Sequence, residues 1–201
     1  MTSYYTEQEL AQIGLKTYGN NVLISRKASI YGAENIAIGD SVRIDDFVII
    51  SGNVQIGSYV HIAAYSAIYA GKYQIVLKDF VTISSRNVIY AESDDYSGAS
   101  LSNPLIKGRY RTTYGNDVVF EKHVLLGTNC TVLPGVNLGE GVSVGAMSLV
   151  KEDLRSWGVY VGIPAKRIKD RNKEILELEQ DFLKEYDYLY TDTNDIPTEK
   201  Y

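Results

Sequence analysis

The sequence predicts an all-β chain wound as a parallel β-helix, and two observations lead to this fold. Aliphatic residues recur every six positions in two long runs, one over 38–89 with a single slip and one from Phe120 to Val150. A small or β-branched residue stands two places before most of them, as Val42 does before Ile44. A helix repeats roughly every 3.6 residues and a plain strand about every two, so this longer period indicates stacked coils of hexapeptides.

Shorter segments flank and interrupt the repeats. In chain order we expect an N-terminal helix and lead-in (1–20), the β-helix (21–168) with an excursion loop (92–117), and a C-terminal helix and tail (169–201). The first helix is expected over 3–14, with Thr6 and Glu9 as a capping box. The second is expected from about residue 170 to 189, followed by a polar, frayed tail from 191. Its apolar stripe would comprise Ile175, Leu178, Phe182, Leu183 and Tyr186.

Individual residues in the hexads carry expectations of their own. Glycine follows several aliphatic positions directly, as at Gly39 and Gly57, where we expect it to permit a backbone turn. Cys130 is the single cysteine and falls on an inward position. We therefore expect a buried structural thiol, in a chain suited to a reducing cytoplasm.

The composition excludes several classes of partner. The net charge is −5 and the isoelectric point is about 5.1, so no basic surface for nucleic acid is expected. No apolar run reaches the length of a membrane span, and the N-terminus lacks a basic-then-hydrophobic signal. We expect a cytoplasmic protein without membrane insertion.

Several segments of the sequence carry a resemblance to a known family. The hexads, the excursion loop, and the stretches 145–151 (GAMSLVK) and 161–168 (VGIPAKRI) resemble the hexapeptide-repeat acyltransferases. The branch is that of galactoside and maltose O-acetyltransferases and bacterial nucleotide-sugar acetyltransferases. Within it, 4–10 (YYTEQEL) and 43–47 (RIDDF) look most like viosamine-type enzymes, which acetylate dTDP-4-amino-4,6-dideoxyglucose.

The resemblance implies a left-handed β-helix, a homotrimer with active sites between subunits, acetyl-CoA as co-substrate and no metal. It also implies that acetyl-CoA lies along the corners of the coil. The residues expected to bind it are Gly127, Thr128, Gly145, Ala146, Pro164, Lys166, Arg167 and Lys169. The cationic ones would meet phosphates, although they also suit a solvated start to the last helix.

The expected catalytic residues depart from those of the O-acetyltransferases. Those enzymes place a basic histidine in the excursion loop, whereas here the loop contains none and carries Asp94 instead. An amine acceptor would resolve this difference, because a neutral amine needs less help from a base than a hydroxyl does. Asp94 and His61 are both candidates to handle the proton. Arg43, Asp95 and Tyr96 are expected to bind the acceptor, with Asp45, Asp46 and further tyrosines as other possible contacts.

His61 precedes an inward isoleucine, so its side chain should point outward. One coil apart along the same face we expect Arg43, His61 and Thr82, and after the loop Leu125. His123 lies at a corner and is expected to be structural.

We therefore expect an acetyl-CoA-dependent N-acetyltransferase acting on a nucleotide-linked amino sugar in lipopolysaccharide O-antigen or other surface polysaccharide synthesis. O-acetylation of a sugar or antibiotic hydroxyl, with His61 as base, is the alternative. A γ-type carbonic anhydrase shares the coil but needs three histidine ligands, and this chain has only two histidines. A scaffold without catalysis would need neither the loop nor the Gly-Ile-Pro-Ala turn.

Overall fold

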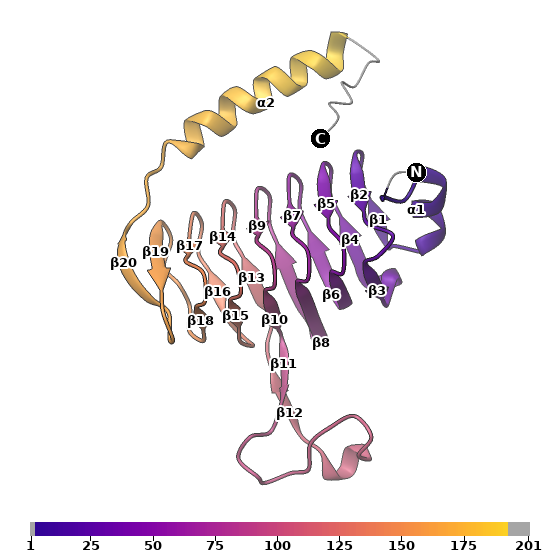
Figure 1. Ribbon diagram of the computed structural model, residues 1–201, viewed down its shortest axis with the longest axis vertical. Coiled ribbons are helices and arrows are strands. Elements are labelled where there is room, and N and C mark those ends of the chain that lie inside the picture. The colour runs from indigo at the N-terminus through magenta and orange to yellow at the C-terminus, as the bar shows by residue number, and fades with distance from the viewer. Residues whose placement is uncertain (1–2, 193–201) are drawn as a thin grey trace. The chain divides into compact units, whose positions relative to one another are not determined.

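The computed structural model describes residues 3–192, which divide into a unit ending at Arg171 and a second unit beginning at Asn172. The first unit is a β-helix of stacked parallel strands (Figure 1). The register of these strands divides it into three faces that meet at three edges. This is the left-handed hexapeptide coil that was predicted.

The first face is an eight-stranded sheet. In order across the sheet it contains β2 (Val22–Ile24), β5 (Val42–Ile44), β7 (His61–Ile62), β9 (Thr82–Ile83), β14 (Leu125–Leu126), β17 (Ser143–Val144), β19 (Gly158–Val161) and β20 (Lys166–Asp170). All neighbours are parallel except the last pair, β19 and β20. The predicted register is confirmed, since Arg43 pairs with His61, His61 with Thr82, and Thr82 with Leu125.

The second and third faces belong to one ten-stranded sheet that bends at an edge. The second face contains β3 (Ser29–Tyr31), the first halves of β6 (Ile49–Ile56) and β8 (Ala67–Leu77), β10 (Val88–Tyr90), β15 (Thr131–Val132) and β18 (Leu149–Val150). The third face contains β1 (Thr17–Tyr18), β4 (Ile36–Ile38), the second halves of β6 and β8, β13 (Val118–Phe120) and β16 (Asn137–Leu138). A 3-10 turn, η1 (Ala33–Asn35), precedes β4.

The hexad residues fill the interior, as predicted. Every aliphatic position of the two runs is buried, and so are the small residues two places before them. The buried set includes Ile44, Ile50, Ile62, Ile68, Ile83, Ile89, Phe120, Leu126, Val132, Leu138, Val144 and Val150. Burial of apolar surface contributes about 25 cal/mol per Å² removed from water, so the packing of these stacked residues is the main source of stability of the coil.

The role expected for the glycines after these positions is wrong. Gly39 and Gly57 do not have positive φ; instead, a Cβ on Gly39 would lie 2.8 Å from the carbonyl carbon of Gly57 in the next coil. These glycines are needed because successive coils approach closely there. The left-handed corners are occupied mainly by larger residues, including Phe47, Tyr59, Tyr65, Phe80, Arg86, His123, Asn129, Met147 and Trp157.

The predicted N-terminal capping box is confirmed. Helix α1 spans Glu7–Ile13, more narrowly than expected, and Thr6 and Glu9 cap it reciprocally. Gly14 ends the helix in the left-handed conformation. Glu9 also pairs with Arg26, which attaches the helix to the first coil.

The excursion loop is a hairpin. Its stem is the antiparallel pair β11 (Glu92–Asp94) and β12 (Thr113–Gly115), and its distal part includes the 3-10 turn η2 (Gly108–Tyr110). Figure 1 shows it leaving the coil between β10 and β13, on the side away from β5 and β7.

The C-terminal boundary differs from the prediction. Residues 166–170 form strand β20, because they pair with β19, and helix α2 begins only at Ile175 and runs to Asp192. Within the second unit, Leu178 and Phe182 of the predicted apolar stripe are exposed. The side chain of Tyr186 and the tail from residue 193 lie outside the described part of the chain.

Candidate active site

Asp45 is the centre of a cluster of polar side chains on the first face. Its Oδ1 atom accepts from Nε of Arg43 at 2.7 Å and from the hydroxyl of Tyr4 at 3.4 Å. Its Oδ2 atom lies 2.9 Å from Nε2 of His61. The parallel pairing of β5 and β7 sets Arg43 beside His61, so the corner residue Asp45 can reach both.

The cluster holds Asp45 in its ionised form. Burial raises the pKa of Asp45, but the hydrogen bonds from His61 and Arg43 outweigh it and leave that pKa below its ordinary value. Burial also raises the pKa of Tyr4, so its hydroxyl keeps its proton at neutral pH. The site therefore presents a fixed carboxylate surrounded by donors.

Asp46 takes part in a separate set of contacts. It accepts from Nζ of Lys27 at 2.7 Å and from the hydroxyl of Ser25. The hydrogen bond from Lys27 lowers the pKa of Asp46. These contacts tie the first two coils together.

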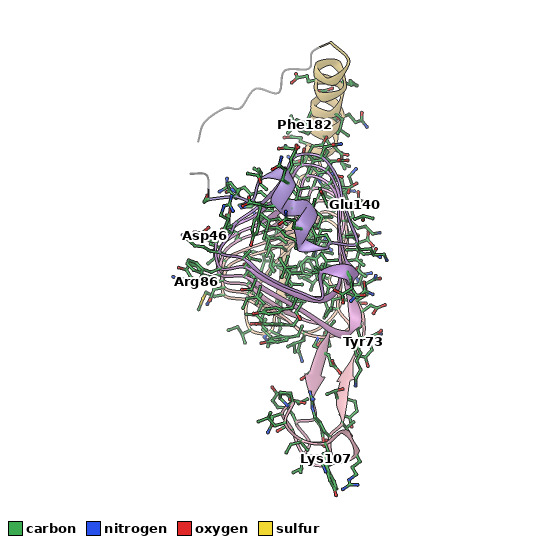
Figure 2. The ribbon with its side chains drawn as sticks, turned by 90° about the vertical axis from the view of Figure 1, so that its right-hand side faces the viewer. Asp46, Tyr73, Arg86, Lys107, Glu140 and Phe182 are labelled. Carbon is green, nitrogen blue, oxygen red and sulfur yellow. The ribbon has the colours of Figure 1, made fainter. Side chains whose placement is uncertain are left out.

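One edge of the prism continues from this cluster toward the C-terminal coils. We call it the first edge; it consists of the residues that follow the first-face strands, namely 45–47, 63–65, 84–86, 127–129 and 145–147. Figure 2 looks along the coil and shows Asp46 and Arg86 together on this edge. Phe47 and Tyr65 stack there with ring centroids 5.0 Å apart.

Four of the residues expected to bind coenzyme lie next to one another on the first edge. The amide of Gly127 donates to the carbonyl of Val144 at 2.8 Å, which sets Gly127 and Thr128 beside Gly145 and Ala146. A Cβ on Gly127 would lie 2.7 Å from the amide nitrogen of Ala146. Thr128 and Ala146 are exposed, so this part of the edge is open to a ligand.

The other expected coenzyme residues follow the last coil. Pro164 lies in the predicted turn, after a cis peptide bond, and is exposed. Lys166, Arg167 and Lys169 lie on strand β20 rather than at the start of a helix. The guanidinium of Arg167 donates to Asp170 at 2.7 Å and to the carbonyl of Trp157 at 3.1 Å.

A polar column lies inside the first edge. Asn87 is fully buried; its amide group donates to the carbonyl of Ser84 at 2.6 Å and its oxygen accepts from the backbone of Cys130 at 2.7 Å. Ser66 also donates to the carbonyl of Ser84, at 2.9 Å. Cys130 is buried, as expected, and burial raises the pKa of its thiol.

The hairpin carries the remaining expected residues. Asp94 accepts from Nε of Arg111 at 2.9 Å across the stem. Asp95 accepts from the amides of Ser97, at 2.8 Å, and Ser100, at 3.0 Å, so its carboxylate shapes the turn. These hydrogen bonds, led by Ser97, lower the pKa of Asp95. Tyr96 is exposed.

Within one chain, the structure does not bring Asp94 to His61. The hairpin leaves the edge between the second and third faces, and Figure 2 places its distal residue Lys107 far from the edge that carries Asp46 and Arg86. His61 and Arg43 come together, whereas Asp94, Asp95 and Tyr96 form a separate group. His123 is buried and stacks on Phe80 at 5.2 Å, in agreement with the structural role expected for it.

Sequence reasoning missed the link between Asp45 and His61 and the polar column. The two residues of the link are separated by 16 positions. Only the coil register brings them together. A signal was available for Asn87, which stands two places before Ile89, where the other hexads carry Val48, Ser66, Cys130 or Ser148.

The described residues contain no cluster of histidine, cysteine, aspartate and glutamate suited to a metal ion. Among their helices, none combines the length and the hydropathy that a membrane crossing requires.

A coil of hexapeptides with a glycine-containing edge and one extruded hairpin defines the class of hexapeptide-repeat transferases. The family described as "Bacterial transferase hexapeptide (six repeats)" matches residues 35–70. The chain is 46% identical over 183 residues to dTDP-4-amino-4,6-dideoxy-D-glucose acyltransferase from Escherichia coli, covering 90% of this chain and 95% of that protein. It is 35% identical to the putative lipopolysaccharide biosynthesis O-acetyl transferase WbbJ of E. coli K12, over 75% of this chain and 76% of that one.

Solved structures agree with this. AntD, an N-acyltransferase from Bacillus cereus solved with dTDP and 3-hydroxybutyryl-CoA, is 51% identical with a TM-score of 0.91, over 93% of this chain and 100% of AntD. The chain belongs to the hexapeptide-repeat acyltransferase family, beside the dTDP-4-amino-4,6-dideoxyglucose acyltransferases. It is an acyltransferase enzyme, and the predicted resemblance is confirmed.

Proposed function

We propose that the chain transfers an acyl group from coenzyme A to the amino group of dTDP-4-amino-4,6-dideoxyglucose. The observation that carries this is the near full-length relationship to an acyltransferase named for that sugar. A solved relative, the S84C variant of AntD, was obtained with the same sugar nucleotide and coenzyme A. The absence of a histidine between residues 92 and 117 agrees with an amine acceptor.

The main requirement on the protein is to place the amine of the sugar beside the thioester carbonyl. The neutral amine attacks the thioester carbonyl, a C–N bond forms, and the C–S bond breaks as the coenzyme leaves as thiolate. Backbone donors on the first edge would stabilise the oxyanion. The extra proton on nitrogen passes to Asp94 or His61, directly or through a water, and from there to the departing thiolate or solvent.

Three groups of residues make up the proposed site. Coenzyme would lie along the first edge, on Gly127, Thr128, Gly145 and Ala146, and reach Pro164, Lys166, Arg167 and Lys169. The sugar nucleotide would lie among Arg43, His61 and the hairpin residues Asp94, Asp95 and Tyr96. Ser84 lies on the first edge, between the coil that carries His61 and the coils that carry Gly127 and Gly145. Solved AntD variants include S84A and D94A of that protein, and this chain carries Ser84 and Asp94 at the same numbers.

We further propose that the active enzyme is a homotrimer, because His61 and Asp94 lie on different edges of one chain and a neighbouring subunit would bring them together. The proposal places the reaction in the cytoplasm, where sugar nucleotides for surface polysaccharides are made. Acetyl-CoA is the proposed donor, and 3-hydroxybutyryl-CoA is the rival donor that the AntD complex suggests.

The test is thiol release from each acyl-CoA with dTDP-4-amino-4,6-dideoxyglucose, and with the matched acceptor that carries a hydroxyl in place of the amine. We expect turnover with the amine only. Asp94→Asn should lower kcat by about a hundredfold, whereas the neighbouring Asp95→Asn should act mainly through KM. Turnover of the hydroxyl acceptor in a His61-dependent reaction would establish the O-acetyltransferase instead.

A mixing experiment tests the composite site. Asp94→Asn and His61→Asn subunits are unfolded together and refolded. If one chain supplies His61 and its neighbour supplies Asp94, about one site in four in random trimers regains both residues. Activity should then exceed that of either variant alone. No gain in a mixture shown to exchange subunits would contradict the shared site.

A further inference from the structure

We propose that Asp45 is a positioning residue that fixes the orientation and tautomer of His61, so that Nδ1 of the imidazole faces the acceptor. The inference rests on the proposed function, in which His61 lies on the acceptor side of the site. Its basis is the 2.9 Å contact between Nε2 of His61 and Oδ2 of Asp45. Neither residue is drawn into this contact by chain proximity, because a full coil separates them.

The exposed fractions of the two side chains indicate that Asp45 holds His61 in place, rather than the reverse. The side chain of Asp45 is 17% exposed, whereas that of His61 is 41% exposed. The carboxylate therefore lies behind the ring, and the ring keeps an open side. Arg43 and Tyr4 occupy the other carboxylate oxygen, which prevents Asp45 from rotating away from His61.

The charge on Asp45 decides where the imidazole proton lies. An ionised carboxylate can only accept hydrogen bonds, so the atom that contacts it must carry hydrogen. Nε2 therefore holds the proton of the neutral ring, and Nδ1 keeps its lone pair. That lone pair can accept a hydrogen from the acceptor amine, or from a water bound to it.

The neighbouring carboxylate offers a matched control. Asp46 stands at the same corner but contacts Lys27 and Ser25 rather than His61. Removing either carboxylate takes one charge from the same part of the surface. Only the loss of Asp45 should change the histidine.

The experiment uses full-length protein labelled with 15N only in histidine. The chain has two histidines, so His123 serves as an internal reference and His61→Asn assigns the remaining signals. We expect wild type to show His61 as the Nε2–H tautomer, with a protected, downfield Nε2 proton. Asp45→Ala should lose that proton to exchange with water, while Asp46→Ala should keep it. A thermal melt checks that each variant is folded.

Kinetics give the second readout. Asp45→Ala should lower kcat/KM for the amino sugar by about tenfold to a hundredfold with little change in KM for the acyl-CoA, and Asp45→Asn, which keeps an acceptor oxygen, should recover part of the loss. An Nδ1–H tautomer in wild type, or an unchanged Nε2 proton in Asp45→Ala, would overturn the proposal. Because the spectrum needs no turnover, failure of the proposed substrate would leave this test intact.

Discussion

Arg111 donates to Asp94 across the stem of the excursion hairpin, with 2.9 Å between Nε and Oδ1. The pair joins the last residue of β11 to the segment just before β12, so it fixes the carboxylate where the hairpin stem ends. Both side chains are about one-third exposed, which leaves Asp94 open to a ligand.

This pair predicts the effect of Arg111→Met. Without its partner the carboxylate of Asp94 samples several orientations, so we expect kcat to fall by about tenfold with a smaller change in stability. Steady-state kinetics with the amino sugar measures it. Arg109→Met is the control, since Arg109 lies over the ring of Tyr110 at 4.7 Å instead. Equal losses in the two variants would mean that the hairpin responds to charge alone.

The base of the hairpin predicts a second effect. A Cβ on Gly115 would lie 2.1 Å from the carbonyl oxygen of Ala91 and 2.5 Å from the ring of Tyr73, and the backbone atom cannot yield cheaply. Gly115→Ala should therefore shift the hairpin and lower activity more than tenfold. Gly108→Ala, in the same hairpin with nothing within 4 Å of its Cβ, should be nearly neutral. The measurement is kcat/KM beside the melting temperature.

The polar column predicts a loss of stability. Asn87→Ala removes the partner of the Cys130 amide and one donor to the Ser84 carbonyl, both in a buried corner. The Ser84 carbonyl keeps its hydrogen bond from Ser66, so the Cys130 amide is the group that loses its partner. An unpaired buried group costs about 1–3 kcal/mol, so we expect the free energy of unfolding to fall by that amount. Denaturant unfolding checks this against Asn137→Ala on the exposed side of β16. If Asn87→Ala lowers the free energy of unfolding by less than Asn137→Ala does, the polar column does not contribute to stability as predicted.

The capped N-terminal helix predicts a dependence on pH. The hydrogen bond from Arg26, with those from Thr6, lowers the pKa of Glu9 from 4.5 to about 2. A lowered folded-state pKa means that the contribution of Glu9 is fully present above pH 4.5 and is lost as the pH falls toward about 2.

Wild type should therefore melt at a higher temperature than Glu9→Gln at neutral pH, and most of the difference should be lost as the pH falls from 4.5 to about 2. Melting curves at three pH values measure it, with Glu7→Gln as the control from the same turn. A difference at pH 2 as large as that at neutral pH would assign the effect to packing rather than to charge.

Much of the fold could be predicted because the hexad is a local pattern with one physical meaning. Each aliphatic residue must be buried, each coil repeats the last, and the outward register of Arg43 and His61 follows from counting. The six-residue spacing could not predict where the coil ends. Residues 166–170 look like the start of a charged helix, yet pairing with β19 makes them a strand.

The sequence by itself determined the coil, the inward residues, the capping box and the class of enzyme, since these depend on spacing and short motifs. Only the tertiary structure decided which polar groups of different coils meet. Asp45 contacts His61 and Asn87 contacts Cys130 because stacked coils bring together residues 16 and 43 positions apart. A hydrogen bond between polar groups of different coils leaves no periodic pattern in the sequence, so it becomes visible only when the coils are stacked.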